Sequence, residues 1–353
     1  MSLSLPLAPT ATNRTLVLGV LGVALLASMV FAAGAGQLHI SAGEVVGSLL
    51  HKVGIDAGSL PSHPQGESSL WRIRFPRIAM AVMVGAALGV AGAVMQGVFG
   101  NPLAEPGVVG VSAGAALAAS AVIVFDVVAL GSWTLPVGAF LGGLVTTIAV
   151  YLLSRQNGRT EVVTLVLTGV AINAMAGGAL AFLMFLGDTS AREEIVFWQL
   201  GSLNGARVEQ VLVTAPLAVA GIAVSLVLAR RLDLLALGDK GARHVGVNVE
   251  RLRMTCIVVV AVLTAAAVAF AGIIAFVGLI IPHLMRMVVG PGHRALVPAS
   301  ALGGAVLLVL ADLWARTAIA YADLPIGMLT SVVGGPVFFW LLRRARRTAG
   351  GWA

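Results

Sequence analysis

The chain is built mainly from apolar runs long enough to cross a membrane, and this limits what it can fold into. A helix that spans the hydrocarbon core needs about 20 consecutive, mostly apolar residues. Only Gly272 separates the seventh run from the eighth, so nine spans are the alternative to ten. We expect ten spanning helices, at Leu16–Ala35, Ile78–Phe99, Val108–Phe125, Leu135–Leu153, Val162–Leu186, Val211–Ala229, Met254–Ala271, Ile273–Val289, Val297–Leu313 and Ile326–Leu342.

The composition agrees with a membrane protein. Of the 353 residues, 59% are hydrophobic and only 10% are charged, whereas a soluble domain carries about 25% charged residues. We therefore expect an all-α polytopic membrane protein in which residues 1–353 form one transmembrane domain. A signal peptide is the alternative for Leu16–Ala33, since Ala33-Gly34-Ala35 resembles a cleavage site. This run is longer than the roughly 7–15 residues of a signal-peptide core, so we interpret it as a retained helix.

The basic residues predict the orientation. With ten spans both termini lie on one side, and the polar segments on that side hold 15 of the 22 Lys and Arg residues. Segments rich in Lys and Arg remain in the cytoplasm, so we expect both termini there. Because the basic residues lie in loops between apolar runs, the net charge of +7 gives no reason to expect a nucleic-acid partner.

Glycine is abundant, with 43 residues. Glycines spaced by four positions allow two membrane helices to approach closely. Three such pairs lie within predicted spans, and they predict a tightly packed bundle: Gly85 with Gly89, Gly110 with Gly114, and Gly138 with Gly142.

Several motifs are absent from the sequence. No segment matches the phosphate-binding loop G-x-x-x-x-G-K-[ST], so we expect that the chain is not an enzyme, has no catalytic residue and depends on a partner to hydrolyse ATP. The only cysteine is Cys256, and the six histidines match no ligand motif, so we expect no metal or other cofactor in the chain. Most span cores lack ionisable residues. Glu105 and Asp312 come closest, and both lie near predicted helix ends. This argues against a carrier driven by an ion gradient.

Arginines flank the start of the second span. Arg74 and Arg77 enclose Pro76, a residue favoured in the first turn of a helix. Two interpretations are open: anchoring of the helix at lipid headgroups, or binding of an acidic partner by exposed guanidinium groups. Asp312 and Arg316 are spaced i, i+4 and can pair on one helix face, which places Arg316 at the outer mouth.

Two stretches are candidates for a substrate path. Gly100–Gly107 contains two prolines and two glycines and cannot continue a helix. Irregular backbone at membrane depth requires cover by protein or a cavity to line, so this stretch is either a tight turn or a constriction on the cytoplasmic side. Farther along, Thr164, Thr168 and Ala171 share one helix face, which suits either helix packing or the wall of a path.

A polar island, Arg230–Arg253, separates two apolar runs on the predicted cytoplasmic side. Apolar residues recur among its charges, and Gly238 interrupts it, so the pattern predicts two short helices. The island is either a solvated positive loop or a surface presented to a soluble partner.

Seven stretches together resemble the FecCD-type permease family of binding-protein-dependent ABC importers, whose members carry vitamin B12, ferric siderophores or haem. The resemblance covers nearly the whole chain from about Leu70 onward. The matching stretches are Arg74-Phe75-Pro76-Arg77, Gly92-Ala93-Val94-Met95-Gln96, Asn101-Pro102-Leu103-Ala104-Glu105-Pro106, Gly110-Val111-Ser112-Ala113-Gly114, Phe197-Trp198-Gln199-Leu200-Gly201-Ser202-Leu203, Phe276-Val277-Gly278-Leu279-Ile280-Ile281-Pro282-His283 and Leu324-Pro325-Ile326-Gly327.

The resemblance implies an assembly. A member is expected to be a type II ABC importer permease with about ten transmembrane helices per subunit, in the inner membrane of a bacterium. It forms a homodimer with a second copy of itself, and the substrate path follows the two-fold axis. Two ATP-binding cassette subunits, which bind ATP and Mg, dock on the cytoplasmic side, and a periplasmic substrate-binding protein delivers the cargo.

The resemblance also assigns site residues. Cytoplasmic coupling helices at about residues 232–252 are expected to contact the ATPase through Gly238, Arg243, His244, Val245, Gly246 and Val247. Docking of the binding protein is expected at Arg74, Arg77 and Arg316. The cytoplasmic gate is expected at Asn101, Leu103, Val162 and Val163, although the two valines replace small hydroxyl residues of the cobalamin members. The face of Thr164, Thr168 and Ala171 is expected to continue the path.

The cargo is predicted from one segment. Gly187–Arg192 resembles the haem-uptake members more than the cobalamin members, so haem is the expected transported substrate. A ferric siderophore or vitamin B12 is the alternative within the family. An ion-coupled secondary carrier is the less favoured alternative outside it.

Overall fold

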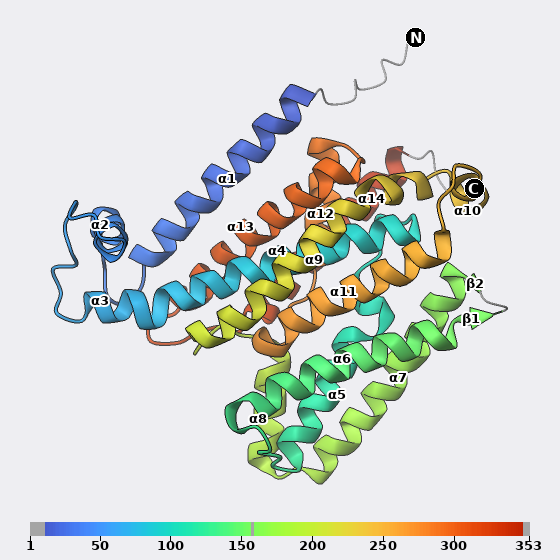
Figure 1. The fold of residues 1–353 in the computed structure, drawn as a ribbon. Helices are drawn as coiled ribbons and strands as arrows, with labels where there is room; N and C mark the ends of the chain where they lie inside the picture. Colours follow the sequence, from blue (N-terminus) through green and yellow to red (C-terminus); the bar gives the residue numbers. More distant parts are fainter. Residues whose placement is uncertain (1–10, 157–158, 349–353) are drawn as a thin grey trace.

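A computed structural model describes residues 11–156 and 159–348. Within these ranges the regular structure is helical except for one antiparallel pairing, β1 (Arg155–Gln156) with β2 (Arg159–Thr160). Figure 1 shows long helices lying alongside one another. The helices are α1 (Ala11–Gly34), α2 (Ala42–Lys52), α3 (Gly66–Ser69), α4 (Phe75–Phe99), α5 (Val111–Val124), α6 (Thr134–Leu153), α7 (Val162–Leu186), α8 (Thr189–Leu200), α9 (Val208–Leu235), α10 (Gly238–His244), α11 (Val249–Ala271), α12 (Val277–Val289), α13 (His293–Thr317) and α14 (Ile326–Thr348), with shorter helical turns at Leu70–Arg74, Pro106–Val109 and Gly131–Trp133.

All ten predicted runs lie on helices, with small differences at their ends. In the part of the chain that the structure describes, seven helices are long and apolar enough to cross a membrane: α1, α4, α6, α7, α9, α11 and α13. The apolar parts of α5, α12 and α14 are shorter. The count of ten crossings therefore stays a prediction, while the helical class is confirmed.

The seventh and eighth runs are clearly separated, so one continuous helix is wrong. α11 ends at Ala271, and Gly272 follows with φ +67° and ψ −164°. A Cβ atom on Gly272 would lie only 2.2 Å from the carbonyl oxygen of Trp198, so α8 covers this irregular backbone. Phe276, at φ +67°, precedes the first residue of α12, Val277. Such a break is tolerated at membrane depth only where protein covers it.

α4 forms the centre of the molecule and is buried along most of its length. Figure 1 shows it surrounded by α9, α11 and α13. A Cβ atom on Gly85 would lie 2.3 Å from the carbonyl oxygen of Gly304 on α13, and one on Gly92 would lie 1.7 Å from that of Gly278 on α12. Gly89 is equally close to α13. The predicted close packing at Gly85 and Gly89 is therefore confirmed, because glycine alone leaves room for the facing backbone.

A second group, α5, α6 and α7, lies beside this core (Figure 1). α5 and α6 approach closely where a Cβ atom on Gly142 would lie 2.5 Å from the carbonyl oxygen of Gly114. α6 also packs against α11. α7 is less covered, since many of its large apolar side chains are exposed in the single subunit.

The two ends of the bundle carry different elements. α2, α3 and α8 lie at one end, and α10, β1 and β2 lie at the other (Figure 1). The first residues of α1 and the last residues of α14 are also on the side of α10. α2 begins with a capping box in which Ser41 and Glu44 bond each other's backbone. Hydrogen bonds from the backbone N–H groups of Ser41 and Ser62 lower the pKa of Glu44 to about 2. The two ends can therefore present different surfaces to different partners.

Candidate functional site

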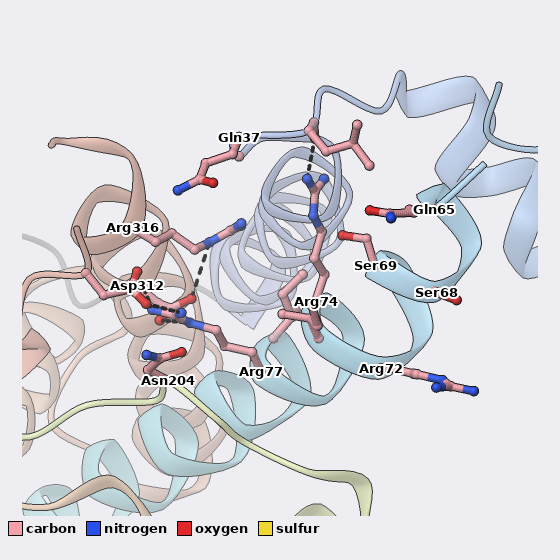
Figure 2. Close-up of a pocket in the computed structure, with 15 residues that line it drawn as sticks. Gln37, Gln65, Ser68, Ser69, Arg72, Arg74, Arg77, Asn204, Asp312 and Arg316 are labelled. Carbon is pink, nitrogen blue, oxygen red and sulfur yellow. Dashed lines mark hydrogen bonds and ion pairs between the residues drawn. The ribbon is translucent and has the colours of Figure 1, made fainter. Parts of the chain in front are cut away.

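The three arginines predicted for docking converge at the end that holds α2 and α3 (Figure 2). The Nε of Arg77 donates to Oδ1 of Asp312 at 2.8 Å, and its Nη1 donates to Oδ2 of Asp323 at 3.0 Å. One turn along α13, the Nε of Arg316 lies 3.6 Å from Oδ2 of Asp312. The predicted pair of Asp312 and Arg316 is therefore confirmed. Arg74 lies beside this ion-pair cluster.

Arg74 and Arg316 together hold the C-terminal end of α1. The last carbonyl groups of a helix lack donors within the helix, and a cation there is favoured by the helix dipole. Nη1 of Arg316 donates to the Ala35 carbonyl at 2.8 Å, and Nη1 of Arg74 donates to the Gly34 carbonyl at 3.0 Å. The same two side chains also donate to the carbonyl groups of Ala32, Ala33 and Leu38. They fix α1 against α13 and the start of α4.

The expectation of exposed guanidinium groups is wrong for Arg74 and Arg77, since each residue is only 6% exposed. A buried charge needs partners, and here they come from the chain itself. Arg72 is exposed and points away from the cluster in Figure 2. A cavity of about 590 Å³ lies among these arginines, with Gln37, Gln65, Ser69 and Asn204 in its wall. Docking of a partner at Arg74, Arg77 and Arg316 stays a prediction.

The predicted gate residues of the loop after α4 form a turn. The side-chain oxygen of Asn101 accepts from the N–H of Leu103 at 2.9 Å, which is the local bonding that favours asparagine in turns. Gly100 precedes it with φ +59°. Asn101 lines a cavity of about 590 Å³ together with Gly238 of α10 and His293 of α13. Asn101 therefore lies beside the predicted coupling region.

The same loop reaches α7 through other residues. The Nδ2 of Asn173 donates to the carbonyl of Gly107 at 3.2 Å. A Cβ atom on Gly169 would lie 1.9 Å from the carbonyl oxygen of Val108, so glycine permits this close contact. A cavity of about 440 Å³ lies along this face of α7 and includes Glu105. The sequence pattern did not indicate Gly169 as a contact with the loop.

The predicted path residues of α7 lie on a different face. Thr164 and Thr168 are half-buried and Ala171 is exposed. Thr164 and Thr168 are each displaced by two positions, or about 200° around the helix, from Val166 and Val170, which line the cavity. Of the two valines at the start of α7, Val162 is half-buried and Val163 is exposed. The predicted path residues therefore do not line this cavity. A partner subunit or lipid would have to cover them, and their role as a path wall stays a prediction.

The polar island contains one separate short helix, so the prediction of two is wrong. α9 continues farther than expected, α10 is the short helix, and the remainder of residues 232–252 belongs to α9, α11 and turns. A second helix is prevented by Gly246, whose φ of +87° makes a turn. Asn248 then caps α11, which begins at Val249.

Most of the predicted coupling residues form a surface on and next to α10. Val245 is 55% exposed. Val247 is a correction to the prediction, because it is only 8% exposed and packs in the core with Ala242. It holds the turn in place instead of facing a partner. The exposed members of the predicted set are Gly238, Arg243, His244, Val245 and Gly246.

Sequence reasoning missed two acidic partners, one of an arginine and one of a histidine. Asp323 pairs with Arg77, although its position directly before the Leu324-Pro325 motif was a usable signal. Asp233, near the end of α9, lies with Oδ1 2.6 Å from Nδ1 of His293 and joins α9 to α13. Nothing in the sequence indicated this second pair. Among the described residues no group of three or more His, Cys, Asp or Glu could hold a metal ion.

These features define a class: a helical membrane protein with separate polar surfaces at its two ends. The model of the FecCD transport family matches residues 24–344, so the chain belongs to this family. It is 43% identical over 286 residues to the hemin transport system permease protein HmuU of Yersinia pestis, covering 80% of this chain and 85% of that protein. It is 43% identical over 272 residues to the cobalamin import system permease protein BtuC of Halobacterium salinarum, covering 77% of this chain and 72% of the relative.

A solved structure agrees with this assignment. The fold matches a metal-chelate type ABC transporter in an inward-facing conformation with a TM-score of 0.83 and 31% sequence identity, over 94% of this chain and 99% of the other. The chain is therefore a membrane permease of the metal-chelate or vitamin B12 type of ABC importer. Its relatives are permease subunits rather than enzymes.

Proposed function

We propose that the chain is the permease subunit through which a bacterium imports haem across its inner membrane. The single observation that supports haem is the 43% identity, over 286 residues, to a hemin permease. The segment that resembles haem-uptake members, Gly187–Arg192, forms a compact turn between α7 and α8. Asp188 caps α8 by accepting from the N–H of Ala191 at 2.8 Å, and Nε of Arg192 donates to the Met184 carbonyl at 2.9 Å.

Cobalamin is the second candidate cargo, because a cobalamin permease is also 43% identical to the chain. A ferric siderophore is the third, as a further metal chelate. All three are bulky molecules that must pass without being trapped. α7 has no charged residue between Val162 and Leu186, so it offers a wall without strong ligands for any of them.

The working unit is a homodimer, with about ten spans per subunit and both termini cytoplasmic. The exposed apolar side chains of α7 support this, since a surface of that size on one helix needs cover by lipid or by a second copy. They include Val163, Leu167, Val170, Met175 and Phe182. Native mass spectrometry of the complex tests the dimer: we expect two permease chains with two ATPase chains, and a complex with one permease chain would contradict it.

Two ATPase subunits, which carry ATP and Mg, dock at the end that holds α10. The chain has no phosphate-binding loop of its own, so the energy comes from a partner. The exposed surface of α10 and the following turn is small, partly basic and contains the apolar Val245. Such a mixed patch suits docking into a cleft on another protein.

The substrate-binding protein docks at the opposite end, over the cavity bounded by the arginine cluster. Arg74, Arg77 and Arg316 shape the floor of this surface through their internal bonds. Arg72 is exposed at its rim and is available to carboxylates of the incoming protein. Guanidinium groups bind carboxylates with two parallel hydrogen bonds.

Transport in proteoliposomes tests the cargo. The permease is reconstituted with its ATPase and binding protein, and ATP-dependent uptake of haem, cobalamin and a ferric siderophore is compared. We expect haem to accumulate. Uptake of cobalamin or of the siderophore in place of haem would overturn the cargo, and uptake driven by a proton gradient without the ATPase would overturn the class.

A further inference from the structure

One arginine joins the short helix α10 to the chain that enters α7. Arg253 lies on α11 and is only 7% exposed. Its Nη1 donates to the Thr160 carbonyl and to Oδ2 of Asp239, both at 2.9 Å, and its Nη2 donates to Oδ1 of Asp239 at 2.7 Å. Asp239 is the second residue of α10, and Thr160 lies two positions before the first residue of α7. A single planar group thus bridges two elements that are far apart in the sequence.

A carboxylate on the same helix also forms hydrogen bonds with Thr160. Glu250 lies one turn before Arg253, and its Oε2 accepts from the Thr160 N–H at 3.0 Å. Its Oε1 accepts from the Thr160 hydroxyl at 2.5 Å and from the Tyr151 hydroxyl at 2.9 Å. The backbone N–H, the carbonyl and the hydroxyl of Thr160 are therefore all bonded to α11. Thr160 itself is only 2% exposed.

The covalent connections of α10 are short. Two residues separate it from α9, and the turn through Gly246 separates it from α11. Its own attachment to the bundle relies on buried Ala242 and on the ion pair of Asp239 with Arg253. The Nε of Arg253 is buried and has no hydrogen-bond partner among the described residues. Separating Asp239 from Arg253 would leave a buried guanidinium without its carboxylate, which is strongly unfavourable.

We propose that Arg253 is a positioning residue that transmits movement of α10 to the start of α7. A partner that displaces α10 pulls on Asp239, and the shared guanidinium carries the displacement to Thr160 and so to Val162 and Val163. Figure 1 shows α10, the start of α11 and β2 together at one end of the bundle. The inference rests on the proposed function, in which the ATPase contacts α10 and the start of α7 belongs to the gate.

Distance measurements between spin labels test this transmission in the whole complex in lipid nanodiscs. The only native cysteine, Cys256, is buried, so labels go on Lys240→Cys in α10 and Glu161→Cys before α7, both exposed positions. The distance between the two copies of each label is recorded with and without ATP. In the otherwise unchanged complex we expect ATP to shift both distances. In Arg253→Gln we expect the shift at position 240 to remain and the shift at position 161 to be lost.

The outcomes separate this inference from the proposed function. If ATP does not change the label distance at position 240 in the otherwise unchanged complex, the proposed contact of α10 with the ATPase is wrong. The proposed transmission is then wrong as well. If both labels shift in Arg253→Gln as they do in the unchanged complex, only the transmission is wrong. Arg251→Gln is the matched control, because Arg251 is an exposed arginine on the same helix. In Arg251→Gln we expect ATP to shift both label distances as it does in the unchanged complex.

Transport and hydrolysis give a second readout. We expect Arg253→Gln to keep its bound ATPase while transport per ATP falls by about tenfold, within the range of coupling changes caused by such mutations. Asp239→Asn should cause a similar loss, and the double variant should be no worse than either single variant, because residues of one network are not additive. Independent, multiplying losses would overturn the inference. Should Arg253→Gln assemble poorly, Asp239→Asn carries the same label measurement, since Asp239 is 41% exposed at its side chain.

Discussion

Arg77 and Asp312 are 235 positions apart in the sequence and meet at 2.8 Å, with both side chains buried. Asp323 binds the same guanidinium, and Arg316 adds a second cation beside Asp312. Two carboxylates thus face two arginines where α4 and α13 meet. The cluster holds the α2 and α3 end of the bundle together, and these two arginines are paired with carboxylates of the chain itself.

Replacing Arg77 by Gln should destabilise the permease. Asp312 would lose its closest cation in a buried site, which costs about 3–5 kcal/mol of the free energy of unfolding. Arg72→Gln is the control at an exposed arginine of the same segment, with an expected change within about 0.5 kcal/mol. Unfolding of both variants by a denaturing detergent in mixed micelles measures the difference. Equal stability of the two variants would show that the buried cluster is not structural.

Replacing Arg72 by Glu should weaken docking of the binding protein without destabilising the permease. An exposed ion pair contributes about 0.2–1 kcal/mol, so we expect the dissociation constant to rise about 1.4- to fivefold. The effect should shrink at high salt because exposed charges are screened. Surface plasmon resonance on permease in nanodiscs measures it, with Arg230→Glu at the opposite end as the control. An unchanged affinity would remove Arg72 from the docking surface.

The helices that contain the ten apolar runs were predictable because each apolar run carries its own signal. The break at Gly272 also lies between two runs, the seventh and the eighth, that were both placed on helices correctly. The burial of Arg74 and Arg77 was not predictable, because their bonding partners lie 41 and 235 positions away. A sequence window shows that an arginine is charged but not whether a distant carbonyl or carboxylate meets it.

The coupling region shows the same limit on a smaller scale. Gly246 was expected on the surface of a coupling helix, but it lies in an exposed turn with a positive φ. The next residue, Val247, was expected on that surface and is buried. Its backbone N–H bonds the carbonyl of Ala242, so the turn folds back onto the bundle. Whether a side chain in this turn faces the surface or the core depends on packing against α9 and α11. Local sequence patterns do not encode that packing.

Replacing Gly92 by Ala should destabilise the core because the added Cβ atom would lie 1.7 Å from the carbonyl oxygen of Gly278. Backbone must move to accept it, at an expected cost of about 1–3 kcal/mol. Gly22→Ala on α1 is the matched control, since no atom lies within 4 Å of the added methyl group. Alanine is favoured over glycine in a helix by up to about 1 kcal/mol, so the control should be unchanged or stabilised. Detergent unfolding midpoints distinguish the two, and a neutral Gly92→Ala would contradict the close approach of α4 and α12.

Replacing Val245 by Asp should lower the affinity of the ATPase for the permease. Val245 is 55% exposed beside the end of α10, so the subunit itself tolerates a polar residue there. In the proposed complex the ATPase covers this position, so loss of a valine contact worth about 1.5–3 kcal/mol should lower the affinity by about tenfold or more. Copurification of the ATPase and its stimulation by the binding protein measure the effect. Val53→Asp, at a 71% exposed position after α2, should leave both unchanged, and equal behaviour of the two variants would exclude α10 as the ATPase contact.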